Sequence, residues 1–564
     1  MQLRPPSSVM KAARLGAFHQ SRLSFMRQLL RRLKREQWQF QRTVWSIDGQ
    51  GVGRAVYVAR GPERAYSLVA FAHDLDPALR SDRVIATAWD ATFALFDGVP
   101  DEVELQRLQA NVPKQEAGRV SSRELCMARA NRSVRLFDHV LQELAAGRQP
   151  DCAFVEQVGY LMRTTAVYGS GKFGAADRES VAARPELSAP FQAEMLTVFL
   201  IRAFSVDLVE HLAQVQAPGT AVVLEPGIRR RLGLGNSTGL GMAPFLLNHP
   251  MLLNNWVQAR ETALQRVRAV RRPTPAEQGM FVDFVRRAQA DARSWHSDHP
   301  LQGQRILELQ QDFKALQLCM GEGILQREYP WDALYRWAEN RLSLEAQEQL
   351  VSLLLEPYGH LIDDLGQTMQ ADEQLGFAVD GSMGVGALKQ ILATDYAWVA
   401  AIDFSTEQSH SLFWYVSEEK LEPRIGQRFS EPGEALEQPL AVARDISRLQ
   451  QALNGCDDGQ TVATFLLEHP EHRHVVRRVQ LAPGCPYADI QDNLIDRALL
   501  PIDLLRCKLS FFGATRFDPR SDRWVRINMY QNAPFPHELS QVLADDWSYP
   551  GLGSQEQRHA CIVE

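Results

Sequence analysis

The spacing of hydrophobic residues changes twice along this chain, and this change most constrains what the chain can fold into. Before about residue 80, aromatic and branched residues form short strand-like runs over 38–44, 54–59 and 65–72. Turn-forming residues separate them, first at Asp48-Gly-Gln-Gly51 and then at Gly61-Pro62. This spacing and turn chemistry predict a small antiparallel meander.

From about residue 82 the apolar residues recur at the 3.6-residue period of an amphipathic helix. Glycine and proline interrupt the pattern at Gly147, Pro218-Gly219, Pro273 and Pro300, which favours several separate helices. The middle of the chain is therefore expected to be a helical body. The predicted helices span 82–97, 121–147, 151–167, 187–215, 242–270, 274–295, 301–319 and 343–355.

Strand-like patterns return in the last third of the chain, mixed with helical ones. The predicted strands span 396–404, 411–416, 474–481, 508–514 and 524–530, and the predicted helices span 435–454, 459–468 and 487–498. This mixture predicts an antiparallel sheet with helices. The expected fold class is α+β and predominantly helical, with an N-terminal antiparallel meander, a central helical body and a C-terminal antiparallel sheet.

Four consecutive segments follow from these changes of period. We expect a basic helix with the meander over 1–80, a mainly helical domain with two glycine-rich loops over 81–380, an α+β domain over 381–545, and an irregular tail over 546–564. The glycine-rich stretch Asp380-Gly-Ser-Met-Gly-Val-Gly386 supports the second boundary. A chain of 564 residues is too long for one core, so several domains are expected.

Composition excludes some classes of function. A net charge of -7 offers no overall attraction for nucleic acid. The sequence contains no run of about 18 apolar residues, so no membrane span is predicted. The seven cysteines form no Cys-x-x-Cys pair, which is typical of a reducing compartment and of a protein without a structural zinc site. His469-Pro-Glu-His472-Arg-His474 matches no metalloenzyme signature, so no metal site is expected. We expect a soluble, cytoplasmic protein.

The first 35 residues contain nine Lys or Arg residues and no acidic residue. One interpretation is a transit-like or membrane-surface amphipathic helix. The other is a helix that packs on the protein itself through its apolar side chains. These are Leu23, Phe25, Met26, Leu29, Leu30 and Leu33.

A glycine-punctuated segment, Gly233-Leu-Gly235-Asn-Ser-Thr-Gly239-Leu-Gly241, precedes the helix expected from Met242. Glycines let the backbone approach a ligand closely, and a helix N-terminus favours a negative charge. The segment therefore predicts a site for a phosphate or carboxylate, although it matches neither the dinucleotide nor the P-loop pattern. The alternative is a tight turn before a helix cap. The predicted anion-binding residues are Gly235, Asn236, Ser237, Thr238 and Gly239.

A second glycine segment, Tyr168-Gly-Ser-Gly-Lys172-Phe-Gly174, follows a stretch that carries Arg163. A lysine between glycines can bind an anion or, when desolvated, act as a base or an imine-forming amine. The alternative is a capped helix end with a solvated lysine. We expect Lys172 and Tyr168 to be catalytic and Arg163 to bind substrate if the two glycine segments meet.

Two further candidates rest on spacing. Asp207 and His211 lie four residues apart on one predicted helix face, a spacing that suits proton transfer, although internal salt bridges are the commoner explanation of such charges. Arg526 lies on a predicted strand and is a candidate for binding a substrate carboxylate, or else a solvent-facing charge.

Together these patterns predict an enzyme that uses general acid–base chemistry, of lyase or transferase type, on a small anionic substrate or an anionic cofactor. No motif identifies a cofactor. One alternative is a non-catalytic nucleotide- or metabolite-binding sensor. Another is a structural or assembly protein that docks through its basic N-terminal helix.

Overall fold

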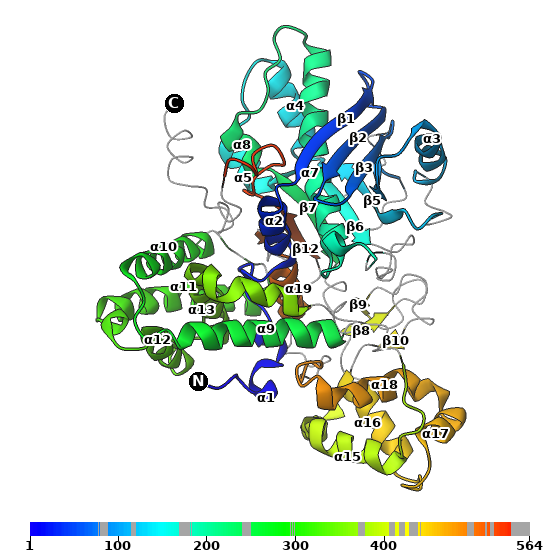
Figure 1. Cartoon of the computed structure of the whole chain (residues 1–564). Coiled ribbons are helices and arrows are strands. Elements are labelled where there is room, and N and C mark those ends of the chain that lie inside the picture. Colours follow the sequence, from blue (N-terminus) through cyan, green and yellow to red (C-terminus); the bar gives the residue numbers. More distant parts are fainter. Residues whose placement is uncertain are drawn as a thin grey trace. The chain divides into compact units, whose positions relative to one another are not determined.

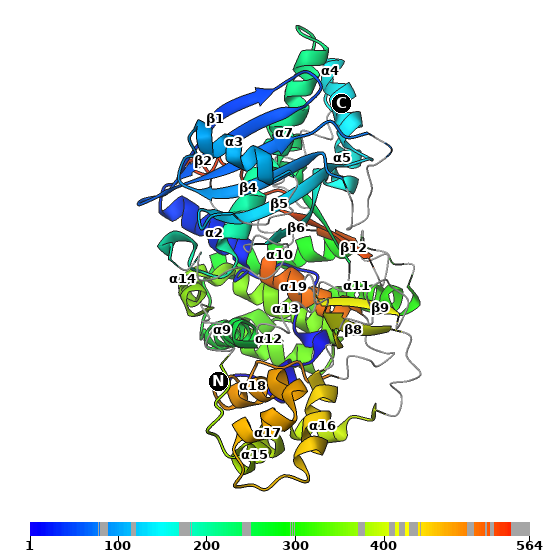
Figure 2. The same ribbon diagram turned by 90° about the vertical axis from the view of Figure 1, so that its right-hand side faces the viewer.

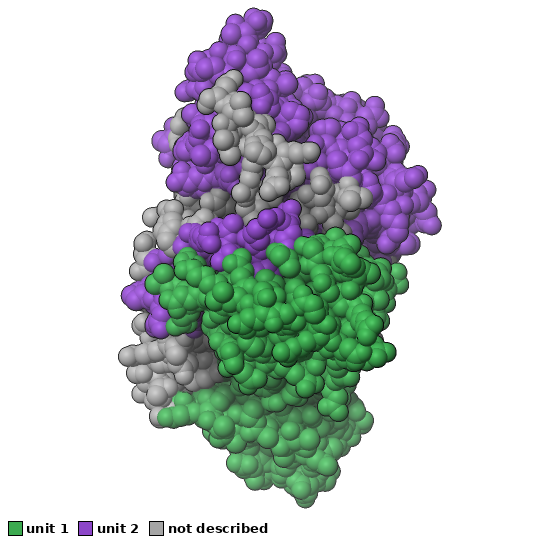
Figure 3. All heavy atoms as spheres, turned by 90° about the vertical axis from the view of Figure 1, so that its left-hand side faces the viewer, with its two compact units in different colours: residues 1–18, 239–282, 307–508 green, residues 19–238, 283–306, 509–564 purple. Residues whose placement is uncertain are grey.

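The chain forms two compact units, each built from segments distant in sequence (Figure 3). Unit 1 comprises 1–18, 239–282 and 307–508, and unit 2 comprises 19–238, 283–306 and 509–564. These limits do not coincide with the consecutive domains expected from the sequence. The structure, a computed structural model, describes residues 1–76, 78, 88–113, 120–168, 181, 183–239, 250–293, 295, 297, 299–369, 378–404, 412–416, 423–427, 438–439, 442–492, 501–513, 516–518 and 524–542.

Unit 2 is organised around a sheet of nine strands in the described residues, in the order β1-β2-β3-β4-β5-β6-β7-β12-β11. Neighbouring strands are antiparallel from β1 through β6, whereas β6 and β7 are parallel to each other. The predicted meander thus forms one end of a larger sheet. The strands are β1 (Gln39–Ile47), β2 (Gly53–Arg60), β3 (Ala65–Ala72), β4 (Ala91–Asp97), β5 (Glu124–Arg132), β6 (Tyr160–Tyr168), β7 (Gly233–Gly239), β11 (Arg516–Asp518) and β12 (Trp524–Met529).

The long helix α7 (Gln192–Gln216) connects the two parallel strands and packs on the sheet (Figure 1). Its Phe204 ring contacts the rings of Tyr57 and Phe93. Side chains alternate between faces along a strand, so Val56 and Val58, on either side of Tyr57, belong to the opposite face. There they join a buried cluster with Leu105 and other residues of α3 (Glu102–Asn111). Each face of these strands is therefore covered by a helix.

Three shorter helices complete this part of unit 2, and one of them packs directly on α7. They are α4 (Phe137–Ala145), α5 (Cys152–Val158) and α8 (Pro226–Arg231), of which α4 contacts α7 and α5 contacts α8. Asp151 caps α5 at its start by accepting a hydrogen bond from the backbone N–H of Phe154. The left-handed Gly159 ends α5 and leads directly into β6.

The basic N-terminal segment contains α2 (Phe25–Arg35), whose apolar side chains are buried. Phe25 lies within 6 Å of the rings of Phe191, Phe511 and Phe512, all in unit 2. The sequence-based interpretation of a helix packed on the protein itself is confirmed for these residues. The buried side chains are Leu23, Phe25, Met26, Leu29, Leu30 and Leu33.

Unit 1 contains a group of helices around Trp331, whose indole nitrogen donates to the hydroxyl of Tyr358 and whose ring lies 4.8 Å from that of Phe281. The helices are α1 (Pro6–Val9), α9 (Pro250–Arg268), α12 (Pro330–Glu339), α13 (Leu344–Leu355) and α14 (Gly359–Ile362). The helices α10 (Pro275–Ala292), α11 (Pro300–Gly321) and α19 (Pro501–Phe512) have residues in both units.

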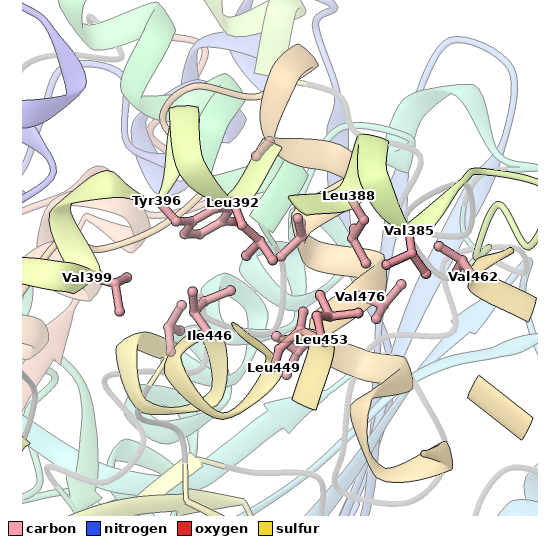
Figure 4. Close-up of a cluster of buried hydrophobic side chains, with 14 of the residues drawn as sticks. Val385, Leu388, Leu392, Tyr396, Val399, Ile446, Leu449, Leu453, Val462 and Val476 are labelled. Atoms are coloured by element: carbon pink, nitrogen blue, oxygen red, sulfur yellow. The ribbon is translucent and has the colours of Figure 1, made fainter. Parts of the chain in front are cut away.

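A second group of helices in unit 1 has its own hydrophobic core (Figures 2 and 4). Leu388 and Leu392 on one helix face Leu449 and Leu453 on another, and these side chains are at most 2 % exposed. The helices are α15 (Val385–Asp395), the 3-10 helix η9 (Ala397–Ala401), α16 (Val442–Leu453), α17 (Val462–Glu468) and α18 (Arg473–Leu481). The strands β8 (Leu412–Val416), β9 (Pro423–Gln427) and β10 (Gln438–Pro439) form a small separate sheet.

The α+β class is correct, but several elements differ from the sequence-based expectation. The segments expected to be helical over 82–97, 121–147 and 151–167 contain β4, β5 and β6, because partners distant in sequence bury them in the sheet. The strands expected over 396–404, 474–481 and 508–514 contain η9, α18 and the end of α19. None of the helices in the described part of the chain has both the length and the apolar character that a bilayer-spanning segment needs.

Candidate functional site

The first glycine segment is a strand where it is described, not a loop before a helix. Gly233 to Gly239 form β7, and the next described helix, α9, begins at Pro250. A side chain at Gly233 would meet the carbonyl of Met529 at 2.6 Å, and one at Gly235 would meet the Tyr160 ring at 2.7 Å. These two glycines allow close packing in the sheet, so the expectation of a loop was wrong for 233–239.

The remaining predicted anion-binding residues of this segment are described only in their backbone. Asn236 pairs with Thr164 of the parallel strand β6, and Ser237, Thr238 and Gly239 continue β7. Their side chains, and residues 240–249 that follow, lie outside the described residues. Their proposed role in binding an anion stays a prediction.

The second glycine segment begins at the carboxyl end of β6, next to the strand that carries the first. Tyr168 is the last residue of β6 and pairs in the backbone with Met127, whereas Lys172 lies outside the described residues. Arg163 lies in the middle of β6, is buried, and pairs with Gly235. Arg526 pairs with Asp518 across β12 and β11, and its side chain also lies outside the described residues.

A row of polar residues crosses the sheet beside Arg163. Asn131 pairs with Arg163, and its side-chain oxygen accepts a hydrogen bond from the backbone N–H of Asp90 at 3.0 Å. The backbone N–H of His73 donates to the carbonyl of Asp90, and its Nε2 lies 3.0 Å from the hydroxyl of Thr92. Burial lowers the pKa of His73, which favours a neutral imidazole in this row, although the charge of Asp90 opposes the shift.

The predicted pair Asp207 and His211 lies on α7, and both side chains turn toward β1 and β2. Asp207 accepts two hydrogen bonds on the same oxygen, Oδ2, from the Tyr57 hydroxyl at 2.7 Å and from Arg42 at 2.9 Å. His211 Nε2 lies 3.3 Å from the carbonyl of Asp48. The two residues therefore make separate hydrogen bonds rather than a direct pair.

Aromatic and cationic groups connect these two side chains into one surface cluster. The Arg42 guanidinium lies 4.6 Å from the centre of the Trp45 ring, and the His211 ring meets the same ring edge-on at 5.4 Å. We call Arg42, Trp45, Tyr57, Asp207 and His211 the α7 surface cluster. Five side chains from β1, β2 and α7 thus meet in unit 2.

The α7 surface cluster keeps hydrogen-bonding groups available to a ligand. Within the described residues, Oδ1 of Asp207 and Nδ1 of His211 make no hydrogen bond. The side chain of Arg42 is 45 % exposed and that of Asp207 is 29 % exposed, so solvent and small molecules reach both. Burial raises the pKa of the Tyr57 hydroxyl, and the neighbouring Asp207 raises it further, so Tyr57 remains a donor to the carboxylate.

The structure does not bring all the predicted site residues together. Tyr57 lies on β2, whereas Arg163 and Tyr168 lie on β6, four strands away in the sheet. At a strand spacing of about 4.8 Å, this separates them by roughly 19 Å. The Asp207 and His211 site is therefore distinct from any site at the glycine segments.

Sequence reasoning missed Arg42, Trp45 and Tyr57 as members of a site. Arg42 is the one charged residue on β1, Trp45 directly follows the strand predicted over 38–44, and Tyr57 lies on the strand predicted over 54–59, so local pattern assigns each to the meander alone. Among the described residues, no group of three or more His, Cys, Asp or Glu side chains is arranged to hold a metal ion.

A scan of protein-family models, a search of curated proteins and a search of solved structures each found no match to this chain.

Proposed function

We propose that this protein is an enzyme that acts by general acid–base chemistry on a small anionic substrate or an anionic cofactor, as a lyase or a transferase. The observation that carries this proposal is the α7 surface cluster. It combines a carboxylate and an imidazole that each keep one unused hydrogen-bonding atom with an exposed guanidinium. These are the groups that proton transfer on an anion requires.

Each residue of the cluster has a distinct proposed role. Arg42 binds the anion through the N–H groups that it does not use on Asp207. His211 and Asp207, one helical turn apart, accept and return the proton through Nδ1 and Oδ1. Tyr57 orients the carboxylate by its hydrogen bond to Oδ2, and so acts as a positioning residue.

The first experiment identifies a ligand for the full chain by thermal shift. The probes are inorganic phosphate, nucleoside triphosphates, coenzyme A esters and di- and tricarboxylates. A ligand at about one hundred times its Kd adds roughly 2.7 kcal/mol to the unfolding free energy. The Arg42→Gln variant should lose this stabilisation, whereas Arg148→Gln, at an exposed arginine that pairs with Glu143, should keep it.

The second experiment separates catalysis from binding, using the ligand found in the screen. Asp207→Asn and His211→Gln should retain ligand affinity within a few-fold but lower kcat by roughly 10²–10⁴. The controls are Asp138→Asn on the exposed side of α4 and His360→Gln on α14. The proposal is refuted if no anion shifts the melting temperature, or if Arg42→Gln and wild type respond equally.

A non-catalytic metabolite sensor is the second candidate function. The observation in its favour is the exposure of Arg42 and Asp207, because acid–base catalysis usually needs a site from which water is excluded. A sensor would lose affinity in Arg42→Gln and show no turnover in wild type. The apolar side chains of α2 are buried in the protein itself, which disfavours the assembly alternative.

Lys172 and the glycine segments are a second candidate site for the same function, separate from the α7 surface cluster. Their support is that β6 and β7 are parallel neighbours, so the chain leaves both strands at the same edge of the sheet. Lys172→Met tests it, with Lys314→Met on an exposed turn of α11 as the matched control. Equal activity of the two variants would remove Lys172 from the mechanism without affecting the α7 surface cluster.

A further inference from the structure

The segment that leads into α2 is polar in sequence but buried in the structure. His19, Gln20, Ser21 and Ser24 are each at most 2 % exposed. Polar side chains are costly to bury unless they find hydrogen-bond partners.

Within the described residues, Nε2 and Oε1 of Gln20 and Oγ of Ser24 have no hydrogen-bond partner. Ser24 occupies the N-cap position of α2, where a serine normally accepts from the first backbone N–H groups, yet it makes no such bond. Both polar atoms of the Gln20 amide lack a partner, so exchanging the positions of its oxygen and nitrogen would still leave both atoms without a hydrogen bond.

A glycine packs closely against the Ser24 hydroxyl. A Cβ atom at Gly513, just after α19, would lie 2.5 Å from Ser24 Oγ. Gly513 also has a φ of +90°, a conformation that other residues rarely adopt. The backbone at Gly513 therefore approaches the hydroxyl closely and brings no side chain that could bond to it.

The charge distribution at this helix end is the reverse of the usual one. The N-terminus of a helix carries partial positive charge and is stabilised by acidic residues in the first turn. The first turn of α2 contains no acidic residue and includes Arg27, which is 1 % exposed. Arg22, two residues before the cap, is also buried. An anion at this position would be stabilised by the helix dipole, and no acidic side chain in the first turn would repel it.

We propose that the N-terminus of α2 binds a small oxyanion that also carries a hydroxyl group, of which hydrogen phosphate is the simplest. The charged oxygens would accept hydrogen bonds from Ser24 Oγ and Gln20 Nε2. The hydroxyl of the anion would donate to Gln20 Oε1, which a fully deprotonated oxyanion such as sulfate would leave unpaired. The site should therefore prefer phosphate to sulfate.

This phosphate site is separate from the α7 surface cluster. Gln192 at the start of α7 donates to the carbonyl of Phe25, the first residue of α2, at 3.4 Å. Asp207 lies fifteen residues further along α7, which corresponds to about 22 Å at a rise of 1.5 Å per residue. The proposal does not depend on the proposed enzyme function, and either can fail alone.

The test uses the full chain, after denaturation and refolding in phosphate-free buffer. Calorimetric titration with sodium phosphate and with sodium sulfate at equal ionic strength should show phosphate binding at least tenfold tighter. Phosphate should also raise the melting temperature. Ion chromatography of acid-denatured protein, purified in phosphate, should release about one phosphate per chain.

Two variants and one control decide where a bound phosphate lies. Ser24→Ala and Gln20→Glu should each raise the Kd for phosphate at least tenfold, the second by placing a carboxylate beside the anion. A double variant at exposed positions of β1, Gln41→Leu with Ser46→Ala, should bind as wild type does. Absence of phosphate binding, equal binding of sulfate, or unchanged binding by both site variants overturns the proposal. Circular dichroism of each variant verifies that it is folded.

Discussion

The guanidinium of Arg202 lies 3.8 Å from the centre of the Phe535 ring, inside unit 2. Arg202 is fully buried on α7 and donates to backbone carbonyls of two distant segments, Leu232 at 2.6 Å and Ala533 at 2.9 Å. Burial lowers its pKa to about 9, yet the ring face and the carbonyl oxygens keep it solvated by the protein. One side chain thus holds two separate loops on the central helix.

Replacing Arg202 should strongly destabilise the protein. The Arg202→Met variant removes the donor from these carbonyls and leaves them buried without a partner, at an expected cost of about 2–4 kcal/mol. Urea unfolding followed by fluorescence measures this cost. Arg148→Met removes an exposed arginine and should change stability by less than about 0.5 kcal/mol. Equal effects of the two variants would contradict the assigned role.

Gly159 and Gly219 allow the cost of close packing to be measured apart from backbone strain. Both have positive φ, 79° and 92°. A Cβ at Gly159 would lie 2.0 Å from the side-chain nitrogen of Asn528, whereas one at Gly219 meets nothing within 4 Å. Gly219→Ala should cost about 1 kcal/mol from strain alone, and Gly159→Ala should cost at least about 2 kcal/mol more. Comparable unfolding midpoints for the two variants would exclude the packing argument.

A buried ion-pair network in unit 1 should make stability fall in acid. Arg4 binds Glu261 through two hydrogen bonds, at 2.7 and 2.8 Å, and also reaches Glu348 at 2.9 Å. Burial alone would raise the pKa of Glu261, but the charges of Arg4 and Arg260 outweigh it and hold the pKa below 4.5. A carboxylate with a lowered pKa in the folded state contributes stability above its unfolded pKa and loses it as the pH falls.

The Arg4→Met variant tests this network. It leaves buried carboxylates without their cation, so stability at pH 7 should fall by about 3–5 kcal/mol. Its stability should also decline less steeply than that of wild type below about pH 4.5, as measured by urea midpoints between pH 3.5 and pH 7. Arg266→Met, at an exposed pair with Asp364, serves as the control. Parallel pH curves for Arg4→Met and wild type would refute the assignment.

His73 should produce a second pH dependence, in a higher range. Because burial lowers its pKa from 6.5, the unfolded chain takes up a proton before the folded protein does. Stability from this group is complete above pH 6.5 and is lost as the pH falls, with a slope of at most about 1.36 kcal/mol per pH unit. His73→Gln should keep a hydrogen-bonding partner for Thr92 but remove this slope between pH 6.5 and pH 5. A stability difference between variant and wild type that is independent of pH would disprove it.

The elements predicted best were those whose pattern is local and uninterrupted. Between Gln192 and Gln216 there is no glycine or proline, and the helix expected over 187–215 agrees with α7. In α18, Val475, Val476 and Val479 are branched residues that resemble a strand, yet they share the buried face of a helix. Packing in the second helical group of unit 1 outweighed local propensity there.

The candidate site was predictable only in part, because several of its contacts join residues that are distant in sequence. Spacing placed Asp207 and His211 on one helix face, and the structure has both facing the sheet. Their partners Arg42 and Tyr57 lie 165 and 150 residues earlier than Asp207, and local spacing carries no information about such pairs. The glycines of β7 predict a loop by local pattern, since the ring of Tyr160, which occupies the side-chain space at Gly235, lies on another strand.

Unit 1 is built from three separate stretches of the chain, and this delays its folding during synthesis. Arg4 and its partner Glu348 are separated by 344 residues, so the arginine leaves the ribosome long before its second carboxylate exists. At roughly 5–20 residues per second, that delay is about 17–70 seconds. Throughout this interval the N-terminal segment cannot adopt its final environment. Nascent unit 1 therefore completes its folding late, and a chain stopped before residue 348 would never bury Arg4 correctly.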